Sequence, residues 1–183
     1  MRDKKVLFIT HAAMIAALYV VLTLLANALG LANYAIQIRF SEALTILPFF
    51  TPAAIPGLTV GCILSNLLTG CMPLDIVFGS LATFIGAAGT YLLRKHVWLA
   101  PVSPILSNTI IVPFILAYVY QFEGSIPYFM LTVGIGELLS CGVFGMILLG
   151  VLMKYRNVIF KADFCRQTER IGYKNKCLQF FKK

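Results

Sequence analysis

Charged side chains are scarce in this sequence. Only 12% of its 183 residues are Asp, Glu, Lys or Arg, whereas 60% are hydrophobic. Soluble domains are typically about half apolar and about a quarter charged, so this composition excludes a soluble class. Several apolar runs are long enough to cross ~30 Å of hydrocarbon, which takes roughly 20 helical residues. The sequence therefore predicts an integral membrane protein.

Common catalytic and metal-binding motifs are also missing. The five cysteines include no CxxC pair and the two histidines, His11 and His96, lie far apart, so we expect neither a metal site nor a disulfide framework. No GxxxxGK[ST] loop is present, which means that the chain cannot hydrolyse ATP by itself. HExxH and GxSxG motifs are absent too, so we expect no enzymatic activity and no cofactor.

Four hydrophobic segments are long enough to cross the membrane, and a fifth stretch is ambiguous. The four are Val6–Leu29, Leu74–Leu93, Trp98–Tyr120 and Ile126–Met153. The first follows MRDKK and is too long for a signal peptide, so it is expected to remain in the mature protein. The ambiguous stretch, Glu42–Gly70, could form one tilted helix or two short ones.

The basic residues favour two helices in this stretch. With six crossings, all 15 Lys and Arg residues except Arg39 lie on one side of the membrane. Because basic residues concentrate in the cytoplasm, both termini are predicted to be cytoplasmic. Proline removes a backbone donor and disfavours helix before it, so we place the break near Thr51 and Pro52, between helices 41–50 and 53–70. The predicted fold is an all-α integral membrane protein with six transmembrane helices and a short second helix.

The chain is predicted to have two parts. Residues 1–153 form a single six-helix membrane domain, and residues 154–183 form a basic cytoplasmic tail. The tail is expected either to lie on the anionic inner leaflet of the lipid bilayer or to be disordered. The net charge of +8 gathers on the cytoplasmic side, so it does not indicate nucleic-acid binding.

The short second helix indicates a binding site inside the membrane domain. Ten residues cannot span the bilayer alone, so the backbone ends must be shielded by protein or by a water-lined cavity. Polar side chains in a membrane domain are costly and are candidate functional residues. A rise of 1.5 Å per residue places Asn108 roughly 15 Å from the inner end of its segment and Glu137 roughly 16 Å from the outer end of the next segment. Both residues are therefore expected near the middle of the membrane, at similar depth. The candidates expected to converge on one outward-open cavity are Arg39, Glu42, Asn66, Asp75, Asn108 and Glu137.

Structural roles compete with these functional ones. Arg39 and Glu42 could form a salt bridge or a capping arrangement. Asp75 could simply begin a helix, and the two asparagines could link helices through hydrogen bonds. Glu137 has no cation nearby in TVGIGELLSCGVFG, so a buried carboxylate there needs a partner or a ligand.

Small residues mark one face of the first segment, ITHAAMIAALYVV. They are Ala12, Ala13, Ala16 and Ala17, and they permit close approach of another helix. Gly57 and Gly61 form a similar pair on the third segment. Internal packing is the interpretation that the residues alone favour for both.

Several stretches together resemble the QueT family. They are QIRFSEALTILPFFTPAAIPGLTVGCILSNLLTG, DIVFGSLATFIGA, WLAPVSPILSNTIIVPFIL and GIGELLSCGVFGMIL. The resemblance covers approximately residues 6–153. It implies a substrate-binding (S) component of an energy-coupling-factor transporter in the bacterial plasma membrane, which takes up queuosine precursors, the 7-deazaguanines. It also implies six helices, a transmembrane coupling (T) component that docks on the alanine face, and two cytoplasmic ATPase subunits.

The resemblance also suggests roles for the polar residues. A 7-deazaguanine presents adjacent N–H donors that a carboxylate can accept in a bidentate pair, and Glu137 is the first choice for this role, with Glu42 second. Asn108 could bond the ring carbonyl or a neighbouring nitrogen, and Asp75 or Glu42 could neutralise an aminomethyl cation. Arg39 could orient Glu42 or bond the ligand oxygen. Further candidate contacts are Asn66 and the aromatic residues Phe40, Phe49 and Tyr34.

Two other functions stay open at this point. The chain could be an S component for another vitamin, or a stand-alone carrier in which Glu137 or Asp75 couples transport to protons. The absence of an internal repeat weighs against the carrier.

Overall fold

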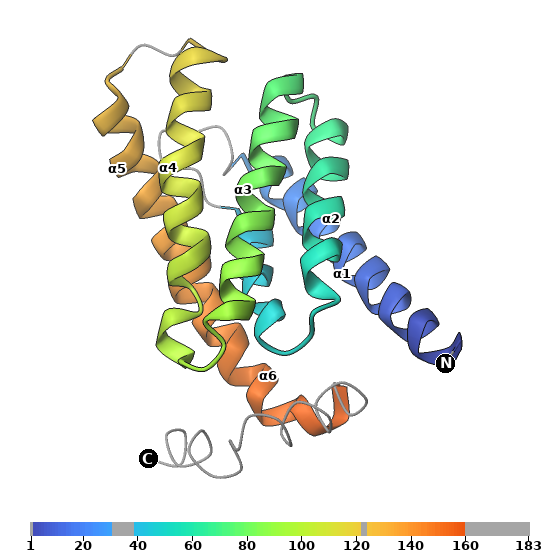
Figure 1. Ribbon diagram of the computed structural model, residues 1–183. Helices are drawn as coiled ribbons and strands as arrows, with labels where there is room; N and C mark the ends of the chain where they lie inside the picture. The colour runs from blue at the N-terminus through green and yellow to red at the C-terminus, as the bar shows by residue number, and fades with distance from the viewer. Residues whose placement is uncertain (1, 31–38, 122–123, 160–183) are drawn as a thin grey trace.

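The computed structural model describes residues 2–30, 39–121 and 124–159, and these residues form helices without any strand (Figure 1). The α-helices are α1 (Arg2–Ala28), α2 (Ala54–Leu68), α3 (Pro73–Leu92), α4 (Val102–Tyr118), α5 (Ile126–Glu137) and α6 (Gly145–Ile159). Three segments wind differently: the 3₁₀-helices η1 (Phe40–Phe49) and η2 (Val97–Leu99) and the π-helix η3 (Leu138–Phe144). The prediction of an all-α fold is confirmed.

The predicted break in the ambiguous stretch is also confirmed. η1 ends at Phe49, Thr51 lies outside any helix, and α2 begins at Ala54. Four helical stretches are long and apolar enough to cross a membrane: Lys5–Ala28, Pro73–Leu92, Val97–Tyr118 and Ile126–Tyr155. η1 and α2 are shorter apolar helices, so the count of six crossings stays a prediction.

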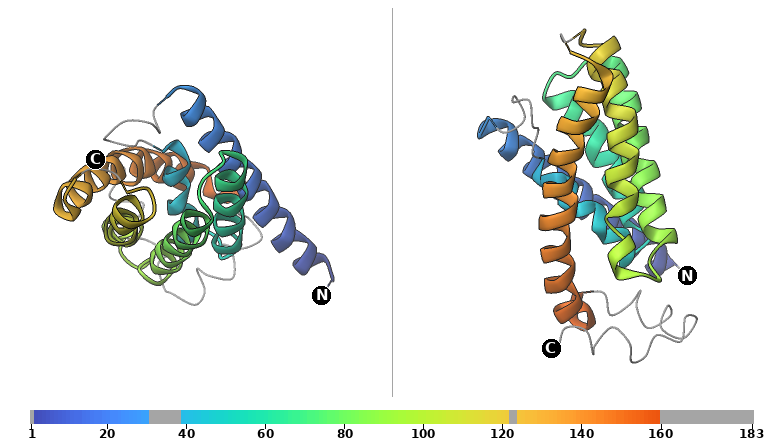
Figure 2. Two further views of the ribbon diagram at one scale, coloured as in Figure 1. Left: turned by 90° about the horizontal axis from the view of Figure 1, so that it is seen from above. Right: turned by 90° about the vertical axis from the view of Figure 1, so that its left-hand side faces the viewer.

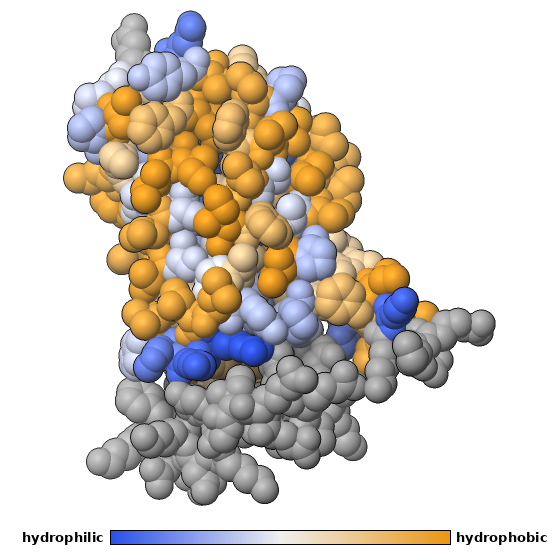
Figure 3. Space-filling view, viewed as in Figure 1, coloured by the Kyte–Doolittle hydropathy of each residue, from blue (hydrophilic) through white to orange (hydrophobic). Residues whose placement is uncertain are grey.

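The helices pack as a bundle with one oblique member. α2, α3, α4 and the continuous α5–η3–α6 rod stand side by side, and α1 crosses the bundle at an angle (Figure 2). The start of α1, the end of α6 and the α3–α4 connection lie at the same end (Figure 1). Figure 3 shows hydrophilic residues at that end below a largely hydrophobic wall. This arrangement is compatible with both ends of the membrane domain lying on one side.

The second helix lies in the middle of the bundle with 3₁₀ winding. Its amides bond three residues back, as in the 3.1 Å bond from Glu42 N to Arg39 O. Ten residues at ~2.0 Å each extend ~20 Å, about 5 Å further than an α-helix of the same length. All residues from Ser41 to Pro48 are buried. The backbone of η1 is therefore shielded by protein, as its shortness predicted.

Small residues bring α1 and α2 into close contact. A Cβ atom added to Gly57 would lie 2.7 Å from Ala12 O, and one added to Gly61 would lie 3.0 Å from Ala16 O. These distances leave no room for a larger side chain at either glycine. Ala12 and Ala16 thus pack internally, whereas Ala13 and Ala17 are exposed.

Candidate functional site

Three polar side chains from distant parts of the sequence meet inside the bundle. Asn108 on α4 donates from Nδ2 to Glu137 Oε1 on α5 at 2.9 Å and to Glu42 Oε2 on η1 at 3.5 Å. Each of the three is at most 8% exposed. The depth estimate from helical rise therefore placed Asn108 and Glu137 correctly. One amide group joins two buried carboxylates, and we call these three residues, with Tyr19 and Cys141 described next, the polar cluster.

Tyr19 of α1 supplies a second donor to Glu42. Its hydroxyl donates to Glu42 Oε1 at 2.7 Å, and the side chain is 1% exposed. Sequence reasoning missed this residue because it lies in an uninterrupted apolar run. A usable signal was present, since Tyr19 lies three residues after Ala16 and seven after Ala12, on the same face of the helix.

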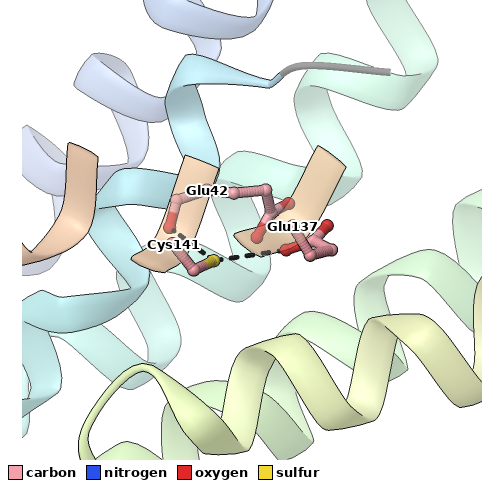
Figure 4. Close-up of side chains that lie close together, drawn as sticks. All are labelled: Glu42, Glu137 and Cys141. Atoms are coloured by element: carbon pink, nitrogen blue, oxygen red, sulfur yellow. Dashed lines mark hydrogen bonds between the residues drawn. The ribbon is translucent and has the colours of Figure 1, made fainter. Parts of the chain in front are cut away.

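Cys141 completes the cluster from the π-helix. Its thiol lies within donating distance of Glu137 Oε2 (3.2 Å) and of the Glu42 carbonyl oxygen (3.3 Å), as Figure 4 shows. Thr45 Oγ1 lies 3.4 Å from the same sulfur. The wider π turn begins directly after Glu137, and π segments occur often at functional sites. Cys141 is therefore a polar contact of both glutamates and not only a small packing residue.

The same atoms could bind a cation. Glu42, Glu137 and Cys141 each offer one ligand atom, and these atoms lie within 4.8 Å of one another. The same carboxylates already accept hydrogen bonds from the Tyr19 hydroxyl and the Asn108 amide. Each carboxylate has further lone pairs, which can accept from a ligand that donates hydrogen bonds as well as bind a cation.

Arg39 brings a positive charge to the edge of the cluster. It immediately precedes η1, and its backbone N–H donates to Ser140 Oγ of the π-helix at 3.2 Å. Its guanidinium lies close enough to interact electrostatically with Glu42 and also with Asp75. The charged residues predicted to converge are thus brought into one region of the bundle.

Asn66 on α2 and Asp75 on α3 lie close together where these two helices meet. Both flank Gly79: a Cβ atom there would lie 3.3 Å from Asp75 Oδ1 and 3.4 Å from Asn66 Nδ2. Asp75 Oδ2 accepts a 2.8 Å bond from the Tyr120 hydroxyl, which in turn accepts from Met72 N at 3.4 Å. Desolvation and the bond to Asp75 raise the pKa of Tyr120 above its ordinary value.

The aromatic candidates have different positions. Phe40 is half-buried and packs edge-on against Phe144 of η3, with ring centroids 5.8 Å apart. Phe49 lies at the opposite end of η1 and packs against Phe50. Tyr34 lies outside the described residues. Of the two aromatic candidates that the structure describes, Phe40 lies at the same end of η1 as Glu42, and Phe49 lies at the other end.

Comparison with known proteins places the chain in a family. A family model described as QueT transporter matches residues 9–154, which includes every residue of the polar cluster. The chain belongs to the QueT transporter family. The resemblance predicted from the sequence is confirmed, and with four long apolar helices it identifies a multi-pass membrane protein.

A curated QueT protein gives a second match. The queuosine precursor transporter QueT of Lactococcus lactis subsp. cremoris (strain MG1363) is 35% identical over 85 residues. The match spans 46% of this chain and 50% of that protein, so it covers about half the length of the curated relative. No solved structure matches the chain significantly.

Proposed function

We propose that this QueT-family protein is the substrate-binding (S) component of an energy-coupling-factor transporter. In this proposal it captures a queuosine precursor, a 7-deazaguanine, from outside a bacterial cell. Both termini lie in the cytoplasm, the bilayer is the plasma membrane, and a T component with two ATPase subunits supplies the energy. Membership of the QueT transporter family and the similarity to the Lactococcus queuosine precursor transporter support the substrate class.

The joined carboxylates of Glu42 and Glu137 are the observation that carries the proposal. A guanine-like edge has adjacent N–H donors, and leaving such a donor unpaired in a buried site costs ~1–3 kcal/mol. Two carboxylates that face one amide group provide acceptors for this edge. In this proposal Glu137 accepts the paired donors, and Asn108 bonds the ring carbonyl or a neighbouring nitrogen.

The remaining candidates surround this pair. Arg39 orients Glu42 or bonds the ligand oxygen, and Asp75 neutralises an aminomethyl cation where the ligand carries one. Asn66 lies beside Asp75, and Phe40 and Tyr34 provide stacking surfaces. The T component is proposed to dock on the alanine face of α1, of which Ala13 and Ala17 are the exposed part. Ala12 and Ala16 of the same face pack against Gly57 and Gly61 of α2.

Equilibrium binding to the purified full chain tests the proposal. Queuine and its aminomethyl precursor are titrated beside biotin, riboflavin and thiamine. We expect tight binding of a deazaguanine without any ATPase subunit and no binding of the three vitamins. Binding of a vitamin alone would move the chain to a different S component. Uptake by the isolated chain in liposomes, driven by a proton gradient, would instead identify a secondary carrier.

A further inference from the structure

Tyr19 links the most exposed helix of the bundle to the polar cluster. α1 runs obliquely along the side of the bundle (Figure 2). Many of its large side chains face outward, among them Val6, Ile9, Met14, Leu18 and Val21. Tyr19 does the opposite: it is 1% exposed and donates its 2.7 Å hydrogen bond to Glu42.

The position of Tyr19 depends on how α1 sits on α2. A Cβ atom added to Gly61 would lie 2.8 Å from Tyr19 Cβ and 3.0 Å from Ala16 O. The neighbouring atoms are a backbone oxygen and a Cβ, neither of which can turn away as the end of a flexible side chain could. Any change in the distance or rotation between the two helices must therefore move Tyr19.

We propose that Tyr19 is a positioning residue that couples the seating of α1 on α2 to ligand affinity at Glu42. The inference rests on the proposed function, in which Glu42 contacts the ligand. Tyr19 fixes one carboxylate oxygen of Glu42, so that the other faces Asn108 and the ligand. A shift of α1 then changes affinity without touching the ligand, which is a coupling between two separate places in the molecule.

A double-mutant cycle on the full chain in detergent tests the coupling, with queuine as the probe. Tyr19→Phe removes the hydroxyl, and Gly61→Ala displaces α1. We expect each to weaken binding roughly tenfold, equivalent to about 1.4 kcal/mol. Because both act through the same hydrogen bond, the double variant should also be about tenfold weaker. Losses that multiply to about a hundredfold, or an unchanged Tyr19→Phe, would overturn the inference.

Two controls keep the result clear. Tyr118→Phe removes a hydroxyl from a residue that is 70% exposed and should leave affinity unchanged. If Gly61→Ala does not fold, Tyr19→Phe combined with Glu42→Gln tests the hydrogen bond on which the coupling depends, and additive losses there overturn the coupling. If the wild-type protein binds no deazaguanine, the proposed function itself is contradicted. If it binds and the losses of affinity in the variants are additive, only the coupling through Tyr19 is contradicted.

Discussion

The two sides of η1 have different surroundings, although they belong to one ten-residue helix. On one side, Glu42 and Thr45, three residues apart, face hydroxyl, amide and thiol groups from α1, α4 and η3. On the other, Leu44 and Leu47, with Phe50 just beyond, belong to an apolar core that includes Leu58. The apolar side fixes the helix in the bundle, and the polar side presents the carboxylate. Substitutions on the two sides should therefore affect different measurements.

The largest expected effect is loss of stability from Phe50→Ala. Phe50 is 1% exposed, and truncating a buried phenylalanine typically costs about 3–5 kcal/mol because a cavity remains. Chemical unfolding in detergent measures the loss. The matched control, Phe84→Ala, changes a side chain that is 46% exposed and should cost far less. Folded Phe50→Ala protein should keep wild-type affinity, and a loss of affinity with unchanged stability would contradict the division of η1.

Glu137→Gln should give the reverse result, a loss of binding with stability close to wild type. The substitution keeps the volume but removes the charge that strengthens its hydrogen bonds. Such bonds contribute ~1.5–3 kcal/mol, so affinity for a deazaguanine should fall roughly 10- to 100-fold. Isothermal titration measures this change. Glu169→Gln, in the predicted tail, is the control and should bind normally; equal losses in both variants would exclude a specific role for Glu137.

Tyr120→Phe should have the smallest effect, since its bond to Asp75 lies outside the polar cluster. We expect a loss of about 0.5–1.5 kcal/mol in unfolding free energy and little change in affinity. Folding raises the pKa of Tyr120, so its contribution is fully present below the unfolded value, ~10, and is lost as pH rises through the folded value. Unfolding of both proteins between pH 7 and 11 measures this. A difference that grows with pH would contradict the assignment.

Charge and proline together predicted most of the architecture. The distribution of Lys and Arg indicated two short helices where hydropathy alone was ambiguous, and Pro52 indicated where they separate. The prediction that Asn108, Glu137 and Glu42 converge also followed from the sequence, because buried polar groups in a membrane protein need partners.

Other features could not be predicted, for physical reasons. In a membrane protein the lipid-facing and buried surfaces are both apolar, so hydropathy does not show that Tyr19 faces inward while Leu18 faces outward, and only the spacing of Tyr19 from Ala12 and Ala16 indicated its side. The 3₁₀ winding of η1 and the π winding after Glu137 have no distinct pattern in the local sequence, and the two segments, about a hundred residues apart, contact each other. For the same reason the sequence did not indicate that Cys141 would approach two carboxylates.

The continuous rod from Ile126 to Tyr155 has a consequence for how the protein fits its membrane. As an α-helix its 30 residues would measure about 45 Å, well beyond the ~30 Å hydrocarbon layer. Figure 1 shows α6 reaching past the lower ends of α3 and α4, so the surplus length falls at that end. The last turns carry Lys154 and Tyr155, whose ammonium and ring centre lie 5.9 Å apart, and both are residue types that favour the membrane interface. Bilayer thickness should thereby influence the tilt of the rod that holds Glu137.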